Sequence, residues 1–354
     1  MQTWDFTRFK QAGQELMSDE HGMAGEDSLI KTYFAPLAAG FAGAFGLDDD
    51  CAALTPEPGQ DLVLKTDAIA EDVHFLAGDD PEDIAWKAVA VNVSDLAAKA
   101  ARPVGYLLSL GFRQAPERQW LQRFADGLRD AQERFGIVLM GGDTDRRPNA
   151  PLSITVMALG SVPTGRMLRR GAGKPGDVLY VSGTLGDSAL GLQLRSSGRA
   201  SSIEPVLAPA DRDFLERRYL RPEPRLGLRQ ALLDHARAAM DLSDGLVKDL
   251  GRMCRASGVA AEIHADRLPL SAPARQLISL HPKFSQMPLT GGDDFEILAS
   301  VAADEAPRFE ASARAAGIPV TPIGQLQSGT GVRVLGPDGQ PLAITRTGYD
   351  HFLS

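Results

Sequence analysis

The chain has 354 residues, a length that suits two domains better than one ordinary hydrophobic core. Its charged and apolar fractions are those of a soluble globular protein, and a formal net charge of -9 argues against a nucleic-acid partner, which would require a basic face. No apolar run approaches the length of a membrane span, so no membrane partner is expected. The two cysteines, Cys51 and Cys254, form neither a CxxC motif nor a disulfide framework, which favours a reducing cytoplasm.

The N-terminal region precedes the first recognisable domain. Residues 1–24 carry acids and lack the apolar segment of a secretory signal. We therefore expect an extension, with a helix around residues 6–16. Asp27 or Ser28 is expected to cap the first helix of the domain. The apolar face of that helix carries Leu29, Ile30, Tyr33, Phe34 and Leu37.

Acidic and hydroxyl residues lie on both sides of the first predicted strand. The acids at residues 48–50 repel one another, so they form either a solvated turn or a cation site. The apolar run 62–64 predicts a short strand whose end carries Thr66 and Asp67. Open sheets place their chemistry at strand ends, and hard oxygen ligands suit Mg²⁺ and phosphate. For Asp67 alone, a simple turn cap is the alternative interpretation.

A helix is predicted to begin at Asp80 and Pro81, because Asp caps helices and Pro fits the first helical position. It runs to about Ala100 and places Asn92 and Asp95 on one face, which is either a polar stripe or a site. The segments that follow are a strand at 104–111, a helix at 117–135, and strands at 137–140 and 152–160.

This order of elements predicts an α+β fold in which helices cover one face of a small sheet. The other face of that sheet needs a partner. We assign to this uncovered face the alternating residues Ile154, Val156 and Ala158.

The second half begins after a segment rich in Gly, Pro and Arg at 160–176, where we place the domain boundary. Residues 183–187 form a Gly-rich turn between a strand and a helix, able to meet an anion with backbone N–H groups, although they form no Walker loop. Pro222 and Pro224 are expected to start another helix. Strands are predicted at 178–181, 239–242, 295–301, 320–325 and 332–335.

Seven short motifs occur in order over almost the whole chain. They are Asp49-Asp50, Lys65-Thr66-Asp67, Asn92-Val93-Ser94-Asp95, Gly141-Gly142-Asp143-Thr144, Asp241-Leu242-Ser243-Asp244-Gly245, Gly291-Gly292-Asp293-Asp294 and Gly348-Tyr349-Asp350-His351-Phe352. Each motif is weak alone, but the ordered set resembles the thiamine-monophosphate kinase family, which is related to aminoimidazole ribonucleotide synthetase. The resemblance covers about residues 25–354.

The resemblance implies an enzyme that converts ATP and thiamine monophosphate into thiamine diphosphate and ADP, with several Mg²⁺ ions. It implies two α/β domains: residues 25–161 for ATP and Mg²⁺ binding and dimerisation, and residues 162–354, with a mixed sheet, to complete the nucleotide and substrate sites. It also implies a homodimer in which the N-terminal sheets of two subunits close on one another.

Site residues follow from the same resemblance, position by position. The implied metal ligands are Asp50, Thr66, Asp67, Asp95, Asp143, Asp241 and Asp244. The implied nucleotide-site residues are Gly142, Asp143, Arg170 and Ser243. The implied contacts to the thiamine phosphate are His74, Asp293 and Tyr349.

Four positions depart from the family pattern. Relatives usually have Gly at Asp48, a hydroxyl residue at Lys65 and Glu at Asp293, and the expected Gly-Glu-Phe is Gly25-Glu26-Asp27. A metal bond from the side chain at position 65 is therefore in question. The contact from Asp293 must reach one methylene further.

The chemistry agrees with this resemblance without depending on it. The acceptor is a phosphate monoester with a second pKa of about 6, so its oxygen is already an anionic nucleophile at neutral pH. No general base is expected; cations on both phosphates and in-line positioning are required. Arg170 is expected to add charge at the transferring group, with a solvated linker Arg as the alternative.

Three alternatives remain open at this stage. One is another enzyme of the superfamily, although this chain has no Cys before Cys51, as a selenophosphate synthetase needs, and ends Phe352-Leu353-Ser354 rather than in the Cys of the hydrogenase-maturation relative. The others are a non-catalytic regulator that binds cations or nucleotide, and a metal-dependent phosphatase.

Overall fold

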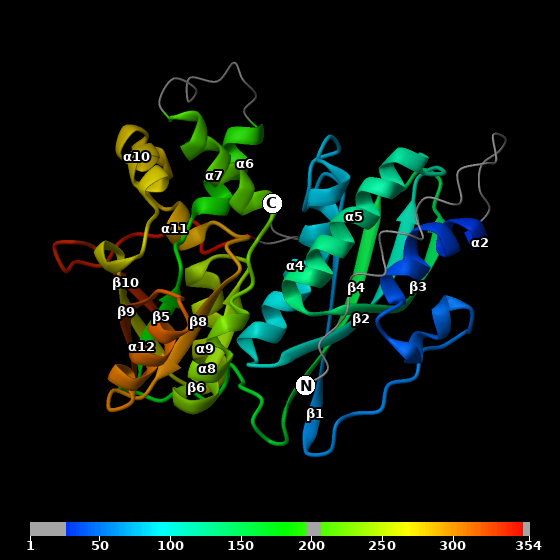
Figure 1. The fold of residues 1–354 in the computed structure, drawn as a ribbon. Helices are drawn as coiled ribbons and strands as arrows, with labels where there is room; N and C mark the ends of the chain where they lie inside the picture. The colour runs from blue at the N-terminus through cyan, green and yellow to red at the C-terminus, as the bar shows by residue number, and fades with distance from the viewer. Residues whose placement is uncertain (1–25, 197–206, 350–354) are drawn as a thin grey trace. The chain divides into compact units, whose positions relative to one another are not determined.

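The computed structural model describes residues 26–196 and 207–349, which divide into two compact units (Figure 1). The described residues up to Pro58, with Leu64–Val89 and Pro103–Leu159, form the first unit. The second unit holds Gly59–Val63, Ala90–Arg102 and the described chain from Gly160 onward. The extension expected at residues 1–24, with its helix at 6–16, lies outside the described residues.

The first unit begins with short helices that together form the predicted amphipathic segment. They are α2 (Glu26–Leu29), η2 (Ile30–Phe34, a π-helical turn), α3 (Ala35–Ala38) and η3 (Ala42–Leu47). Leu29, Phe34 and Leu37 are buried, as the apolar periodicity predicts. Asp27 and Ser28, the expected caps, lie within α2 instead. Both α3 and η3 contact strand β3 of the sheet, so this segment covers part of one sheet face.

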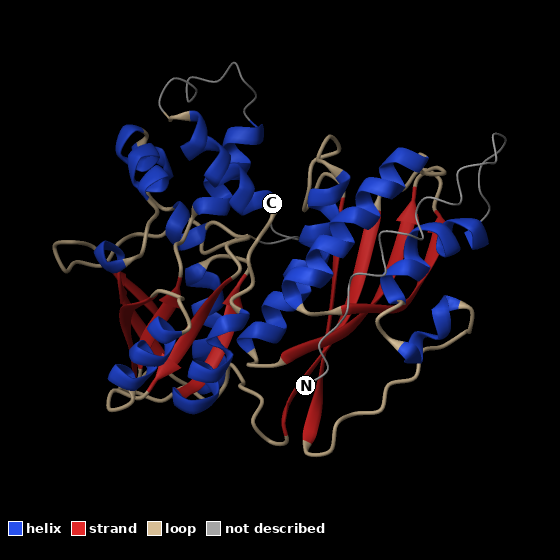
Figure 2. Ribbon diagram, viewed as in Figure 1, coloured by secondary structure: helices blue, strands red, loops and turns tan. Residues whose placement is uncertain are grey.

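A four-stranded sheet and two long helices make up most of the rest of the first unit (Figures 1 and 2), although the start of one strand and the second half of one helix belong to the second unit. The sheet order is β1 (Gln60–Ala70), β4 (Ser153–Pro163), β2 (Arg102–Phe112) and β3 (Val138–Arg146). The helices are α4 (Pro81–Ala98) and α5 (Arg118–Phe135). The predicted sequence of strand, helix, strand, helix, strand, strand is therefore confirmed. The carboxylate of Asp80 accepts the N–H of Glu82 at 3.0 Å, so Asp80 caps α4 as expected.

One part of the prediction for this sheet is wrong. Ile154, Val156 and Ala158 have no exposed surface within a single chain, so they are core residues and cannot form the uncovered face. The fully buried Tyr106 of β2 accepts a hydrogen bond from Gln132 of α5 at 3.0 Å, which marks the helical side of the sheet. Successive strand residues alternate between faces, and the sequence pattern alone does not say which alternate set the helices cover.

The second unit is built on a mixed six-stranded sheet, as expected. Its order is β10 (Gly331–Leu335), β7 (Ala260–His264), β9 (Val320–Gln327), β5 (Val178–Ser182), β8 (Glu296–Val301) and β6 (Ala236–Leu242). The pair of β10 and β7 is parallel, and the other neighbouring pairs are antiparallel. Sequence analysis missed β7, whose Ala-Ala-Glu-Ile-His segment has little apolar alternation.

Helices lie on both faces of this sheet (Figure 2). They are α6 (Asp187–Ser196), α7 (Pro209–Leu220), α8 (Arg229–His235), α9 (Leu246–Ser257), α10 (Ala272–Leu280), α11 (Met287–Thr290) and α12 (Ala306–Ala315), with the short 3₁₀ turns η4 (Leu226–Leu228), η5 (Ala265–Arg267) and η6 (Pro282–Phe284). Strand β5 shows why both faces are covered. Leu179 and Val181 belong to a core cluster with Leu250 of α9. Tyr180 lies between them and points to the other face, where its ring centroid is 5.1 Å from that of Phe309 of α12.

No helix in the described part of the chain combines the length and the apolar character needed to cross a membrane.

Candidate functional site

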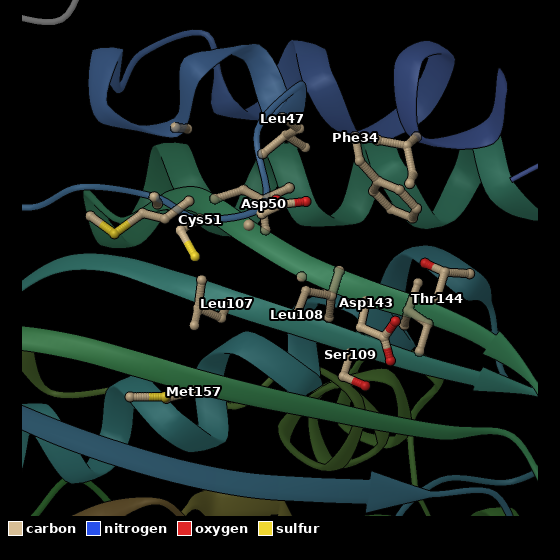
Figure 3. A pocket seen from close by; sticks show the side chains of 18 of the residues that line it. Phe34, Leu47, Asp50, Cys51, Leu107, Leu108, Ser109, Asp143, Thr144 and Met157 are labelled. Atoms are coloured by element: carbon tan, nitrogen blue, oxygen red, sulfur yellow. The ribbon is translucent and has the colours of Figure 1, made fainter. Parts of the chain in front are cut away.

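The first unit contains a pocket of about 570 Å³ between the sheet and the N-terminal helical segment (Figure 3). Strand residues Leu107, Ser109 and Met157 line it on one side, and Phe34 and Leu47 line it on the other. These strand residues alternate with the buried set that faces the helices. The pocket therefore occupies the sheet face that α4 and α5 leave open.

Three residues with implied ligand roles line this pocket: Asp50, Gly142 and Asp143. Asp50 lies in the loop after η3, and Asp143 lies on β3 beside Ser109 of β2 (Figure 3). Gly142 is required by close strand packing, because a Cβ there would lie 1.9 Å from the carbonyl oxygen of Leu108. An apolar surface with carboxylates at its edge has the composition of a site for a ligand with both an aromatic and a charged part.

Strand β1 presents Thr66 and Asp67, also in the first unit. The Thr66 hydroxyl donates to the carbonyl oxygen of Val156 at 3.1 Å, which leaves the lone pairs of the hydroxyl oxygen available to a cation. The Asp67 carboxylate pairs with the ammonium of Lys65 at 3.0 Å. The departure at position 65 thus places a cation of the protein next to a predicted metal ligand.

His74 follows β1 in a loop and is half-buried. Its Nδ1 accepts the N–H of Ala70 at 3.1 Å, and its carbonyl oxygen accepts a hydrogen bond from Lys87 at 2.8 Å. The ring is therefore held in place by its own loop, which distinguishes His74 from a histidine free in solvent.

In the second unit, the end of α4 meets the end of β6. The Ser94 hydroxyl donates to Asp241 Oδ2 at 2.9 Å, and both side chains are buried. Asp95 is the next residue on α4, and Lys99 donates to the carbonyl oxygen of Ala239 at 2.8 Å. The two implied metal ligands Asp95 and Asp241 thus lie on neighbouring segments that are hydrogen-bonded to each other.

The loop after β6 carries Ser243 and Asp244, and α9 holds it in place. Asp249 Oδ2 accepts the backbone N–H groups of Ser243 at 3.1 Å and of Asp244 at 2.9 Å. Arg252 bridges Asp249 Oδ1 and Asp244 Oδ2, each at 2.6 Å. Lys248 Nζ lies 3.6 Å from Asp244 Oδ2.

Asp293 and Tyr349 attach to this same loop. The N–H of Asp293 donates to the carbonyl oxygen of Ser243 at 2.8 Å, and the N–H of Tyr349 donates to that of Asp244 at 2.9 Å. Asp293 has a φ of 66°, in the left-handed region, and this hydrogen bond helps to hold it there. The Tyr349 side chain is exposed. Arg170 is also exposed and belongs to the linker, where its carbonyl oxygen accepts a hydrogen bond from Ser257 at 3.0 Å.

The Gly-rich turn at 183–187 donates a backbone N–H to a carboxyl group of the protein itself. The N–H of Gly186 donates to Asp294 Oδ2 at 2.8 Å, in a buried environment shared with Asp187 and Glu296. Burial raises the pKa of Asp294 well above its ordinary range and also raises the pKa of Asp187. This turn is therefore a structural element rather than a second phosphate site.

The oxygen donors in both units suit Mg²⁺. Within the described residues, no group of three or more His, Cys, Asp or Glu side chains is arranged to hold a metal ion. Mg²⁺ commonly takes only one or two carboxylates, with waters and substrate phosphates as its other ligands. Asp50 and Asp143 at the pocket, and Asp241 and Asp244 in the second unit, provide donors of this type.

Comparison with known proteins gives the same family as the ordered motifs. The model "AIR synthase related protein, N-terminal domain" matches residues 48–162, and the model "AIR synthase related protein, C-terminal domain" matches residues 174–336. The curated thiamine-monophosphate kinase of Escherichia coli (strain K12) is 40% identical over 332 residues, covering 93% of this chain and 98% of that protein. The chain belongs to the thiamine-monophosphate kinase family.

Solved structures of thiamine-monophosphate kinases share the fold. That of Stenotrophomonas maltophilia K279a has a TM-score of 0.75 and 40% identity, covering 84% of this chain and 91% of that one. The structure of AaThiL complexed with AMPPCP and TMP has a TM-score of 0.74 and 31% identity, covering 88% of this chain and 97% of that one. The predicted family and fold class are confirmed.

Sequence reasoning missed three residues that organise the thiamine-monophosphate kinase motifs of this chain: Ser94, Asp249 and Arg252. Ser94 stands inside a motif, but the motif alone assigns it no role. Asp249 had a detectable signal, since an acid in the first turn of a helix often bonds backbone N–H groups near the start of that helix. Arg252 follows Asp249 by three residues on the same helical face.

Proposed function

We propose that this chain transfers the γ-phosphoryl group of ATP to thiamine monophosphate, giving thiamine diphosphate and ADP. The observation that carries the proposal is the grouping of the motif residues within each unit. Asp50, Gly142 and Asp143 share one pocket. In the second unit, Asp293 and Tyr349 are both hydrogen-bonded to the loop that carries Ser243 and Asp244.

In the reaction, a phosphate oxygen of thiamine monophosphate forms a bond to the γ-phosphorus of ATP, and the bond between that phosphorus and the β,γ-bridging oxygen breaks. ADP leaves with the electron pair of the broken bond. The attacking oxygen is anionic at neutral pH, so the chain need not supply a general base. Its main tasks are to hold the two substrates in line and to offset their negative charge.

Bound Mg²⁺ supplies positive charge to the phosphates. We assign its ligands to Asp50, Thr66, Asp67 and Asp143 in the first unit and to Asp95, Asp241 and Asp244 in the second. Gly142, Asp143, Arg170 and Ser243 contact the nucleotide in this proposal. His74, Asp293 and Tyr349 contact thiamine monophosphate. The exposed Tyr349 ring suits the cationic thiazolium, since an aromatic face attracts a cation by about 0.5–2 kcal/mol.

We also propose that residues 25–161 form the nucleotide-binding and dimerisation domain and that residues 162–354 complete the substrate site. A homodimer accounts for the open sheet face, where β1 exposes Leu64 to solvent. A cytoplasmic location agrees with the two free cysteines and with ATP as the phosphoryl donor.

The direct test is incubation of the purified protein with ATP, Mg²⁺ and thiamine monophosphate, with thiamine diphosphate and ADP measured by chromatography. We expect both products in equal amounts, and none without the acceptor. Release of inorganic phosphate without thiamine diphosphate would indicate a phosphatase. ATP binding without turnover would indicate a regulator, and cyclisation of a phosphoribosyl amidine would indicate a synthetase of the superfamily.

A further inference from the structure

The loop at Ser243 and Asp244 is the point where three segments of the second unit meet. It follows β6 and accepts N–H groups from the Gly291–Asp293 segment and from Tyr349 through its own carbonyl oxygens. The approach at Gly292 is close, because a Cβ there would lie 2.6 Å from the carbonyl oxygen of Ser243. We name residues 243–244, with Asp293 and Tyr349, the substrate hub.

The substrate hub depends on one buried carboxylate that the proposed reaction does not use. Asp249 is fully buried, and its two oxygens accept three hydrogen bonds, from the N–H groups of Ser243 and Asp244 and from Arg252. Burial raises the pKa of Asp249, while Arg252 and the N–H of Asp244 favour its charged form. A buried carboxylate with this many donors fixes the donors as firmly as they fix it.

Asp249 holds the backbone on which the hub is built. By accepting the N–H of Asp244 it fixes the peptide whose carbonyl oxygen, that of Ser243, accepts the N–H of Asp293. By accepting the N–H of Ser243 as well, it anchors the segment whose next carbonyl oxygen, that of Asp244, accepts the N–H of Tyr349. Through Arg252 it also sets the direction of the Asp244 carboxylate. One side chain therefore controls the backbone and the side chain of the hub together.

We propose that Asp249 is the positioning residue of the substrate hub, and that through it the nucleotide contact of Ser243 and the thiamine phosphate contacts of Asp293 and Tyr349 are held as one unit. This inference rests on the proposed function for the roles of those residues. Asp249 touches neither substrate. Its removal disturbs both binding contacts at once, whereas removal of a single contact residue disturbs one.

Asp249→Asn is the test, and Asp177→Asn is its matched control. Asp177 is also a buried carboxylate that accepts a backbone N–H, from Lys174 at 2.9 Å, and lies 3.6 Å from an Arg, Arg237. Asp177 immediately precedes β5, whose first residue, Val178, pairs with Val301 of β8. Val301 also pairs with Ala236, the first residue of β6. Because the hub follows the last residue of β6, Asp177 lies at the opposite end of the sheet from the hub.

For Asp249→Asn we expect kcat to fall and the KM for both ATP and thiamine monophosphate to rise. We expect kcat/KM to decrease about 10–100-fold, the range found for residues that hold metal ligands in place by hydrogen bonds. Asp177→Asn should lose a similar amount of thermal stability and keep both KM values within about twofold. Equal stability losses with unchanged KM and kcat in both variants would show that Asp249 is only structural and would overturn the inference.

Hydrogen exchange on the wild-type protein decides the case if Asp249→Asn does not fold. Addition of Mg²⁺ and AMPPCP should slow amide exchange in residues 242–249 and, through the hub, in residues 290–296. Protection confined to residues 242–249 would overturn the inference. A wild-type protein that makes no thiamine diphosphate would refute the proposed function, and the exchange experiment would still test the hub.

Discussion

At the scale of single residues, the predicted metal ligands differ in what already surrounds them. The Asp67 carboxylate has the Lys65 ammonium at 3.0 Å, and the Asp244 carboxylate has Arg252 at 2.6 Å, whereas Asp50 and Asp143 lie at an open pocket. A cation that binds Asp67 or Asp244 must therefore share it with a charge of the protein. Exposed pairs such as that of Lys65 are worth only about 0.2–1 kcal/mol, so sharing is inexpensive there.

The first prediction tests the carboxylates of the first unit. Asp67→Asn and Asp143→Asn keep the size of the side chain and remove a charge from the proposed Mg²⁺ ligands, so we expect activity to fall by orders of magnitude in steady-state assays. The melting temperature should stay level or rise as repulsion between acids decreases. Asp145→Asn is the control. Asp145 is an exposed acid on β3, the strand of Asp143, and it already pairs with Arg147. Near-normal turnover of both variants at low Mg²⁺ would contradict the assignment.

The second prediction uses the two cysteines as probes of the pocket. Cys51 is exposed and lines the pocket next to Asp50, whereas Cys254 is buried and its pKa is raised to about 11 by burial. Because the thiolate is the reactive form, iodoacetamide at pH 8 should label Cys51 and spare Cys254. Mg²⁺ with AMPPCP should slow the labelling of Cys51 at least several-fold, as measured by mass spectrometry of peptides. Labelling of Cys51 at the same rate with and without the nucleotide would show that the nucleotide does not bind in this pocket.

These residue contacts also show how far sequence reasoning reaches. The types and order of the acids could be read directly, and Asp67, Asp143 and Asp241 each come at the end of an apolar run that predicts a strand. The partners that orient them could not. Ser94 and Asp241 are 147 positions apart and meet only because a helix and a strand end at the same place.

At the scale of elements, strands were easier to predict than the direction in which each strand faces. The strand containing Ile154, Val156 and Ala158 was predicted correctly, and its buried face was assigned to the wrong side. Period-two alternation gives two faces, and only tertiary packing decides which one the helices cover. The same limit applies to the turn at Gly186, whose N–H binds Asp294 rather than a ligand.

The third prediction concerns Asp294, which accepts the N–H of Gly186 in this turn and comes just before β8. Asp294 is buried and faces Asp187 of α6, Arg218 of α7 and Glu296 of β8, and burial raises its pKa well above the value of about 3.9 expected in an unfolded chain. The folded protein therefore keeps a proton that the unfolded chain has lost, so this group lowers stability as pH rises from about 4 to the folded pKa. The loss is about 1.4 kcal/mol for each pH unit in that window.

Asp294→Asn should remove this pH dependence while its amide oxygen still accepts the N–H of Gly186. We expect the variant to gain stability relative to wild type as pH rises from 5 to 8, measured as the free energy of unfolding in urea. Asp177→Asn, which removes another buried carboxyl group, is measured over the same range as the control. A difference between Asp294→Asn and wild type that stays constant across this range would mean that Asp294 is ionised in the folded protein.

At the scale of the whole molecule, the first unit has a sheet with one face in its own core and one that its long helices leave open. On the open side, the pocket lies over β2 and β3, and the edge strand β1 exposes Leu64. Exposed apolar residues on an edge strand invite pairing with another chain, and natural proteins usually protect such edges. A second copy of the same chain is the partner that the proposed homodimer provides.

The last prediction tests that homodimer through Leu64, which is 61% exposed on β1. If two first units close on one another, Leu64 is buried in the dimer, and Leu64→Asp places a charge without a partner in that interface. Burial of such a charge is costly enough to separate the subunits. The control is Leu280→Asp, because Leu280 is 53% exposed on α10 of the second unit, where no contact between subunits is proposed. Sedimentation velocity at micromolar concentration should give a dimer for the wild type and for Leu280→Asp, and a monomer for Leu64→Asp. A monomeric wild type would refute the homodimer, and a dimer that persists in Leu64→Asp would place the interface on another surface.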